Sequence, residues 1–175
     1  MFSGMGSTYF GLLAWLPDAY VEHGWSERSA GFLLAAMNLT AIPCSFLIPW
    51  LSDRHGGRRP WLAGTATLFA ASVVGLATVP AAGYVWALLV GVAQGGTFAL
   101  VMTLPLDLGD TRERVGALVG LMLGVGYSVV SLSPFALGAL RDGTGSYDVV
   151  LWTCAALAGT MVTLVTLLPR PRPSS

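Results

Sequence analysis

A short polar loop, residues 51–60 (LSDRHGGRRP), separates two apolar runs that are each long enough to cross a bilayer. Several of the chain's few charged residues lie within this loop: Asp53, Arg54, Arg58 and Arg59. Two glycines between them, Gly56 and Gly57, allow the chain to turn tightly. Charge crowded between two apolar runs is typical of a loop at a membrane surface, because irregular polar backbone is not tolerated in contact with lipid. The loop therefore predicts a protein with several membrane spans and not a soluble domain.

The composition excludes several classes of function. Charged residues make up 10% of the chain, against about 25% in soluble domains. A net charge of zero gives no basic surface for nucleic acid. Cys44 and Cys154 lie inside apolar runs, where we expect buried thiols and no disulfide, metal site or cofactor. Neither H-E-x-x-H nor G-x-S-x-G occurs, and His23 and His55 lie outside the apolar runs, so we predict that the protein is not an enzyme.

The charge-free stretches divide the chain into membrane spans of roughly 18 residues or more. Between residues 60 and 106 no charge occurs, and the segment 80–83 (PAAG) splits this stretch into two. The predicted fold class is an all-α membrane protein with one bundle over residues 1–168 and a cytoplasmic tail over 169–175. Six transmembrane helices are expected: 1–17, 29–52, 61–79, 84–106, 115–140 and 149–168.

The basic residues predict the orientation of these spans. If the spans alternate in direction, one side of the membrane receives seven arginines: Arg54, Arg58, Arg59, Arg112, Arg114, Arg170 and Arg172. The opposite side receives only Arg28 and Arg141. Because cytoplasmic loops carry an excess of arginine and lysine, both termini of the chain are predicted to be cytoplasmic in an inner, cytoplasmic membrane.

A weak internal repeat relates the two halves of the chain. Leu51-x-Asp53-x-x-Gly56 ends the second predicted span, and Leu140-x-Asp142-x-x-Gly145 ends the fifth. These are corresponding positions in two sets of three helices, on opposite sides of the membrane. An inverted three-plus-three repeat would produce this pattern.

Several segments resemble the major facilitator transporters. The loop 53–59 (DRHGGRR) is similar to their D-R-x-G-R-R signature, with one extra residue before the arginine pair. The segments 9–17 (YFGLLAWLP), 94–100 (QGGTFAL) and 124–127 (GVGY) resemble the seventh, tenth and eleventh helices of the cyanate and nitroimidazole permease group. The loop 141–147 (RDGTGSY) is also similar. The resemblance implies the C-terminal six-helix half of a twelve-helix transporter.

The resemblance also implies a function: secondary active transport of a small solute by alternating access, with a small anion such as cyanate or a small polar heterocycle as substrate. The partners would be the lipid bilayer and a second six-helix half, either a missing N-terminal half or a second copy. Two alternatives remain open, a self-contained homodimeric transporter or channel and an inactive truncated remnant. No ionisable residue lies in mid-span, so we expect no proton relay in this half.

Uncharged polar and aromatic residues are the candidates for substrate contact. Gln94 ranks first, because it carries a full amide at about mid-depth of its span with glycines close by. An interhelical hydrogen bond is the alternative role for this glutamine. The other candidates, for which packing or anchoring at the membrane surface is the alternative, are Asn38, Tyr9, Trp15, Thr97 and Tyr127.

A conformational latch is implied for the cytoplasmic loops. A carboxylate near a helix end can accept backbone N–H groups and pair with arginine, and we expect Asp53 to reach the start of the fifth helix. In the family such a latch holds the cytoplasmic side shut in the outward-facing state. Its expected members are Asp53, Arg54, Arg58, Arg59, Arg112 and Arg114. The alternative is that the arginines only fix the orientation of the chain.

Two sets of glycines predict close helix packing. Gly116, Gly120 and Gly124 recur every four residues on one helical face, as do Gly91 and Gly95. Small residues at this spacing let membrane helices approach closely. The same faces are candidates for surfaces that slide during transport.

Overall fold

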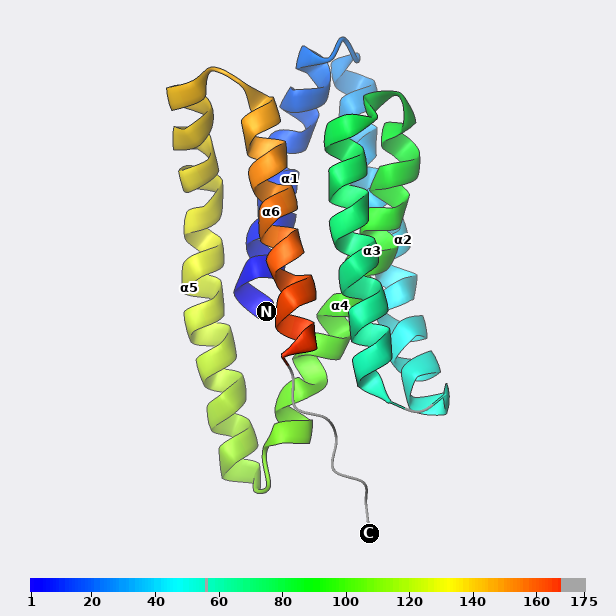
Figure 1. Ribbon diagram of the computed structural model, residues 1–175, viewed down its shortest axis with the longest axis vertical. Helices are drawn as coiled ribbons and strands as arrows, with labels where there is room; N and C mark the ends of the chain where they lie inside the picture. The colour runs from blue at the N-terminus through cyan, green and yellow to red at the C-terminus, as the bar shows by residue number, and fades with distance from the viewer. Residues whose placement is uncertain (56, 168–175) are drawn as a thin grey trace.

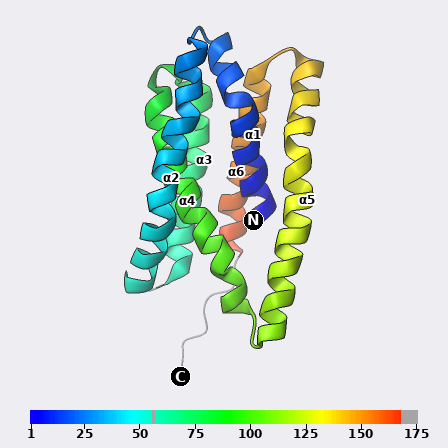
Figure 2. The same ribbon diagram turned by 180° about the vertical axis from the view of Figure 1, so that it is seen from behind.

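The computed structural model describes residues 1–55 and 57–167, except for the side chains at positions 107 and 108. Within these residues the chain forms six long α-helices and one short 3₁₀ helix. Their bounds are α1 Phe2–Glu22, α2 Glu27–His55, α3 Arg58–Thr78, η1 Pro80–Ala82, α4 Gly83–Leu108, α5 Arg112–Thr144 and α6 Tyr147–Thr166. The α-helices run roughly parallel to the long axis of an elongated bundle (Figures 1 and 2). The predicted tail, 169–175, lies outside the described residues.

Each predicted span corresponds to one of these helices, which confirms the prediction of an all-helical fold. Five of them, α2 to α6, are long and apolar enough to cross a membrane. Helix α1 is not among the five, because serines, threonine and glycines fill its first half and Asp18 and Glu22 lie near its end. Its N-terminal end lies part-way along the bundle (Figure 1).

The ends of the helices follow from local sequence signals. Thr111 caps α5 by accepting a hydrogen bond from the backbone of Arg114, and Ser146 caps α6 in the same way from Asp148. Gly145 ends α5 in the left-handed conformation, with φ of 70°, which glycine adopts without a steric penalty. Gly57 adopts φ of 85° and permits the tight connection from α2 to α3.

The first helix of each half of the chain packs mainly against helices of the other half. Helix α1 contacts mainly α5 and α6, while α4 contacts mainly α2 and α3. Helices α3 and α6 join the two groups by packing against each other. At one end Tyr20 adds a polar link between α1 and α3, since its buried hydroxyl donates to the carbonyl of Leu76 at 3.1 Å.

The closest helix contact is the one between α2 and α4, and it depends on two glycines. A Cβ atom at Gly91 would collide with the backbone of Met37, and one at Gly95 would collide with the backbone of Ala41. The hydroxyl of Thr40 donates to the carbonyl of Leu88 across the same contact at 2.9 Å. Such close backbone approach is the main source of helix association in lipid, where no hydrophobic effect operates between helices.

We predict that Gly95→Val destabilises the chain by about 1–3 kcal/mol, because the added side chain meets backbone that cannot move aside. The measurement is unfolding of the purified chain in mixed micelles. Gly31→Val is the matched control, since a Cβ at Gly31 of α2 meets nothing within 4 Å. Equal stability of the two variants would contradict the assigned contact.

Candidate functional site

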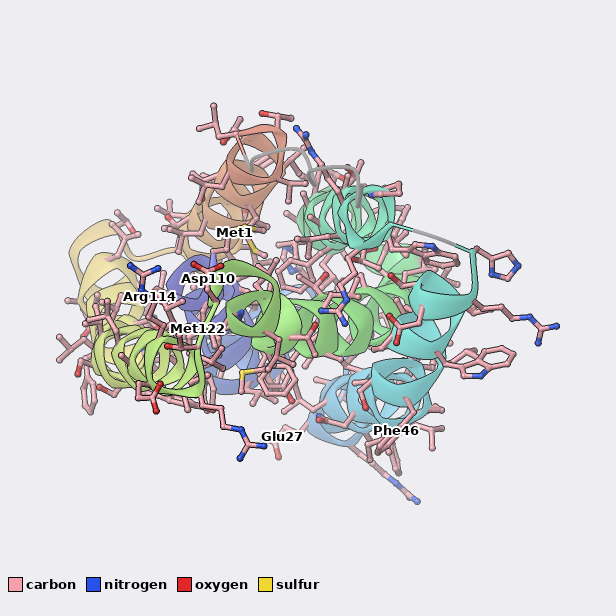
Figure 3. The ribbon with its side chains drawn as sticks, turned by 90° about the horizontal axis from the view of Figure 1, so that it is seen from below. Met1, Glu27, Phe46, Asp110, Arg114 and Met122 are labelled. Atoms are coloured by element: carbon pink, nitrogen blue, oxygen red, sulfur yellow. The ribbon has the colours of Figure 1, made fainter. Side chains whose placement is uncertain are left out.

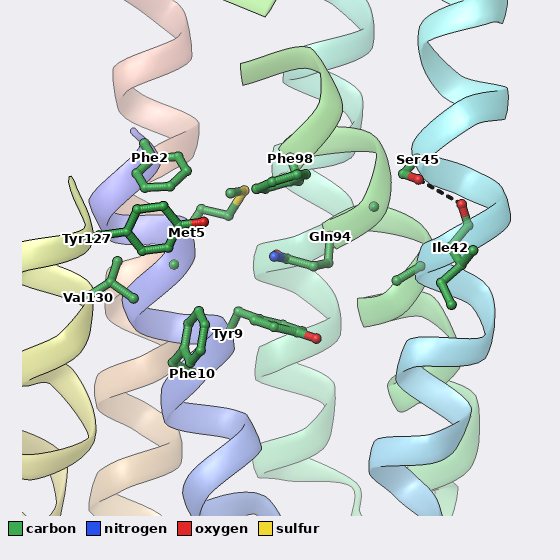
Figure 4. A pocket seen from close by; sticks show the side chains of 13 residues that line it. Phe2, Met5, Tyr9, Phe10, Ile42, Ser45, Gln94, Phe98, Tyr127 and Val130 are labelled. Atoms are coloured by element: carbon green, nitrogen blue, oxygen red, sulfur yellow. Dashed lines mark hydrogen bonds between the residues drawn. The ribbon is translucent and has the colours of Figure 1, made fainter. Parts of the chain in front are cut away.

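A cavity of about 310 Å³ lies between α1, α2, α4 and α5. Aromatic and apolar side chains form most of its wall, as Figure 4 shows. The lining residues are Phe2, Met5, Gly6, Tyr9, Phe10, Ala41, Ile42, Ser45, Gln94, Gly95, Phe98, Tyr127 and Val130.

Helical periodicity brings these side chains together. On α1, the residues Phe2, Met5 and Tyr9 are three or four positions apart and share one face. On α4, Gln94 and Phe98 are four apart, and both face the cavity (Figure 4). The cavity therefore has a wall of aromatic rings from α1, α4 and α5 and a single amide among them.

Gln94 is the main polar group of the cavity. The residue is 7% exposed, and its Oε1 atom has no hydrogen-bond partner among the described residues. Figure 4 shows its side chain pointing across the cavity toward Met5 and Tyr127. A buried amide oxygen without a partner costs about 1–3 kcal/mol. Figure 4 shows the amide nitrogen of Gln94 toward the cavity, so the nitrogen is the atom that a bound molecule meets first.

Tyr9 and Asn38 form a hydrogen-bonded pair in the cavity wall. The Tyr9 hydroxyl donates to Oδ1 of Asn38 at 2.7 Å, and Nδ2 of Asn38 donates to the carbonyl of Leu34 at 2.8 Å. Asn38 thereby fixes the position of the tyrosine, and the phenol oxygen keeps lone pairs available for another donor. Asn38 is therefore a positioning residue behind Tyr9 and is not part of the lining.

Further rings complete the wall. Tyr127 meets Phe2 edge to face, with ring centroids 5.1 Å apart, and Phe10 meets Tyr9 in the same way at 5.6 Å. The ring centroid of Phe98 lies 6.5 Å from that of Phe2. Rings held in this way present flat, polarisable surfaces that suit an aromatic guest.

The cavity contains no charge from this chain. None of its lining residues is Asp, Glu, Lys, Arg or His. In the described part of the chain, no group of three or more His, Cys, Asp or Glu residues is placed to hold a metal ion. Recognition by this wall therefore relies on one amide, a few hydroxyls and the aromatic rings.

Two predicted contact residues lie away from the cavity. Trp15 donates from its indole nitrogen to the carbonyl of Pro134 at 3.1 Å, and its ring fills the space above Gly138. It therefore joins α1 to α5. Thr97 is fully buried one turn after Gln94 and is not a lining residue.

Sequence reasoning missed the apolar part of the wall, namely Phe2, Met5, Phe10 and Phe98. Phe98 could have been found, because it follows Gln94 by four positions on the same helical face. The phenylalanines of α1 carry no such signal, since a phenylalanine that faces lipid gives the same pattern.

The charged residues at the loop end of the bundle form separate groups. Asp53 pairs with Arg58 at 3.7 Å, and Arg58 also reaches the carbonyl of Thr103 on α4 at 3.4 Å. On the other side of the bundle, Arg114 pairs with Asp110 at 3.0 Å (Figure 3). In the described chain no ion pair joins Asp53 to Arg112 or Arg114, so the expected contact with the start of α5 is not made in this conformation.

Two other arginines expected in the latch make contacts outside it. Arg54 lies over the ring of Trp50, 5.4 Å from its centroid. Arg59 donates to the carbonyl of Thr166 at 2.7 Å and so ties the start of α3 to the end of α6.

The two predicted sets of packing glycines differ in their surroundings. Gly91 and Gly95 lie in the α2–α4 contact, and Gly95 also borders the cavity. Gly116, Gly120 and Gly124 are exposed, and a Cβ at any of them would meet nothing within 4 Å. This face of α5 is therefore not packed against the described chain, and a packing role for it requires a partner from outside.

A sequence model of the Major Facilitator Superfamily matches residues 1–175, the whole chain. The chain belongs to the major facilitator superfamily. Membership agrees with several apolar helices and identifies a multi-pass membrane protein of a transporter family.

Three relatives of this major facilitator chain are named as transporters. A cyanate transport protein of Escherichia coli (strain K12) is 34% identical over 160 residues, which cover 91% of this chain and 41% of the relative. A 2-nitroimidazole transporter of the same strain is 31% identical over 159 residues, 90% of this chain and 40% of the relative. An uncharacterized transporter of Bacillus subtilis (strain 168) is 28% identical over 84% of this chain and 37% of its own length. The chain thus spans about two fifths of these relatives.

We predict that Trp15→Phe lowers the free energy of unfolding by about 1 kcal/mol, because the ring is kept while the hydrogen bond to Pro134 is lost. Unfolding in mixed micelles measures this effect, and solute affinity should stay unchanged. A loss of affinity with unaltered stability would instead place Trp15 at the substrate.

Proposed function

We propose that this chain is the C-terminal six-helix half of a twelve-helix secondary transporter. It would move a small, planar, polar ring compound across the cytoplasmic membrane by alternating access. The observation that carries the proposal is the aromatic cavity around Gln94, whose amide oxygen has no hydrogen-bond partner among the described residues.

Two observations support a half-transporter. The chain matches about two fifths of the length of its transporter relatives. The packing also supports an inverted three-plus-three repeat: α1 lies against α5 and α6 just as α4 lies against α2 and α3. If α1, α2 and α3 are exchanged with α4, α5 and α6 in that order, the contacts of α1 become those of α4. The cavity lies between α1 and α4, the first helices of the two triplets.

The surface beside the cavity favours a second half as the partner. Exposed apolar side chains occur on α2 and α5, two of the helices that form the cavity, including Phe46 at 75% and Phe135 at 77% exposure. The open glycine face of α5 lies on the same helix as Tyr127. A second six-helix half would cover these surfaces and close the cavity from its open side.

The chemistry of the cavity favours a ring over a small linear anion. An amide offers one donor group and one acceptor, so it can make two hydrogen bonds to a ring edge that carries both. The surrounding rings gain contact area only from a flat guest. A compact anion such as cyanate would leave these rings uncovered and would meet no cation from this chain, although burial of unpaired charge is costly. Of the two substrates in the names of the relatives, 2-nitroimidazole suits this wall better than cyanate.

The distribution of arginines supports the proposed orientation. The α2–α3 loop and the α4–α5 loop lie at the same end of the bundle (Figures 1 and 2). We infer that this end, with Arg54, Arg58, Arg59, Arg112 and Arg114, faces the cytoplasm.

We propose that the latch forms in a different conformation of the protein. Here Asp53 pairs with Arg58, and the start of α5 lies on the far side of the bundle (Figure 3). We propose that this carboxylate exchanges its partner when the cytoplasmic side closes, in line with the resemblance of the loop to the family signature. If the arginines only set orientation, no such exchange would occur.

We predict that Gln94→Leu raises the concentration of 2-nitroimidazole needed for half-maximal uptake about tenfold, the loss expected for one to two hydrogen bonds. Uptake is measured in cells that express the transporter containing this chain. Asn38→Leu is the comparison, because it removes the hydrogen-bond partner of the Tyr9 hydroxyl and leaves the amide of Gln94 in place. Unchanged affinity in Gln94→Leu, or stronger uptake of cyanate than of the ring compound, would contradict the proposed cavity.

We predict that Asp53→Asn lowers the maximal rate of uptake severalfold while the amount of protein in the membrane stays normal, because the neutral amide pairs weakly with arginine. Asp142→Asn, at the corresponding position after the fifth span, serves as the control. If uptake by Asp53→Asn equals that of the unaltered protein, the latch is absent.

A further inference from the structure

A second cavity lies on the opposite side of α4, in the outer surface of the bundle. It is a groove of about 350 Å³ between α2 and α3, with α4 as its floor. The lining is almost entirely apolar: Ile48, Pro60, Trp61, Gly64, Thr65, Leu68 and Val92. The hydroxyl of Thr65 is directed to the carbonyl of Leu62, so it leaves the groove without a free donor.

The groove exists because α2 and α3 each pack against α4 more than against each other. Gly64 widens it, since a Cβ at this position would meet nothing within 4 Å. From Pro60 to Leu68 the groove follows about 12 Å of α3. In a bilayer this space lies among hydrocarbon chains, and a chain that fills it regains the dispersion contacts that an empty groove would lose.

The loop end of the groove carries positive charge. His55 lies beside the groove residue Trp61, with ring centroids 6.5 Å apart, and Arg54 precedes it. The guanidinium of Arg54 lies over Trp50, and no carboxylate of the described residues forms an ion pair with it. The first turn of α3 holds no acidic residue. An apolar groove with a cationic end matches an acyl chain joined to a phosphate.

We propose that this groove binds one anionic phospholipid, with an acyl chain along Pro60–Leu68 and its phosphate at Arg54 and His55. The site is separate from the substrate cavity, because the two share no lining residue. Lipid binding at this site does not depend on the proposed transport function. It would give the loop between α2 and α3 a lipid partner.

The test is native mass spectrometry of the full chain after exchange into micelles with equal amounts of phosphatidylglycerol and phosphatidylcholine. We expect one retained phosphatidylglycerol per chain. Arg54→Gln should lower its retention about fivefold, whereas Arg28→Gln should not, although Arg28 makes the same kind of contact with an aromatic ring at the other end of α2. Equal retention of the two lipids, or equal loss in the two variants, would overturn the proposal.

A separate variant tests whether the acyl chain of the lipid lies in the groove. Gly64→Leu places a side chain in the groove at a position where the added Cβ meets nothing within 4 Å, and it should lower phosphatidylglycerol retention at least fivefold. Gly31→Leu on α2, where the Cβ is equally unobstructed, should leave retention unchanged. A phosphatidylglycerol with a photoreactive acyl chain should label residues 60–68 of the unaltered protein, which tests the site independently of any variant. Labelling elsewhere, or displacement of the lipid by inorganic phosphate alone, would show that the groove does not hold the chain.

Discussion

The close approach of α4 to α2 is the contact on which the rest of the structure depends. In lipid the helices gain little from the hydrophobic effect, so their association requires backbones that can touch. Gly91 and Gly95 provide this contact against the backbone of Met37 and Ala41. Gln94 lies between the two glycines in sequence, and the same contact therefore sets how far its amide reaches into the cavity. Packing and recognition share one turn of α4.

The sequence predicted the helices well, because the bilayer imposes their length and excludes charge from their interior. Six apolar runs became six helices in the described residues. It also predicted three cavity residues, Tyr9, Gln94 and Tyr127, since a polar atom within a span needs a partner or a ligand. The phenylalanines of the cavity could not be predicted, because apolar side chains toward lipid and toward a cavity give the same pattern. Trp15 shows the converse, since its polar atom is satisfied by a carbonyl of a neighbouring helix.

The ends of the helices were harder to predict than their interiors. Sequence placed Asp53 and the arginines at one membrane surface, but several ion pairs are possible among them. The structure selects Asp53 with Arg58 and Arg114 with Asp110, both between residues close in sequence. The glycines of α5 illustrate a related limit: their spacing indicates a packing face, but the partner of that face is not part of the described chain. The absence of mid-span charge also leaves the prediction that any coupling group lies in another part of the protein, or that transport is not proton-coupled.

We propose that the cavity is one wall of a site that a second six-helix half of the same polypeptide completes. The most direct test is the mass of the intact polypeptide, extracted from its own membrane and measured by mass spectrometry. If this chain is one half of a transporter, the polypeptide should have roughly twice the 18.3 kDa of this chain or slightly more, in keeping with the length of its transporter relatives. A native polypeptide of 18.3 kDa would contradict it.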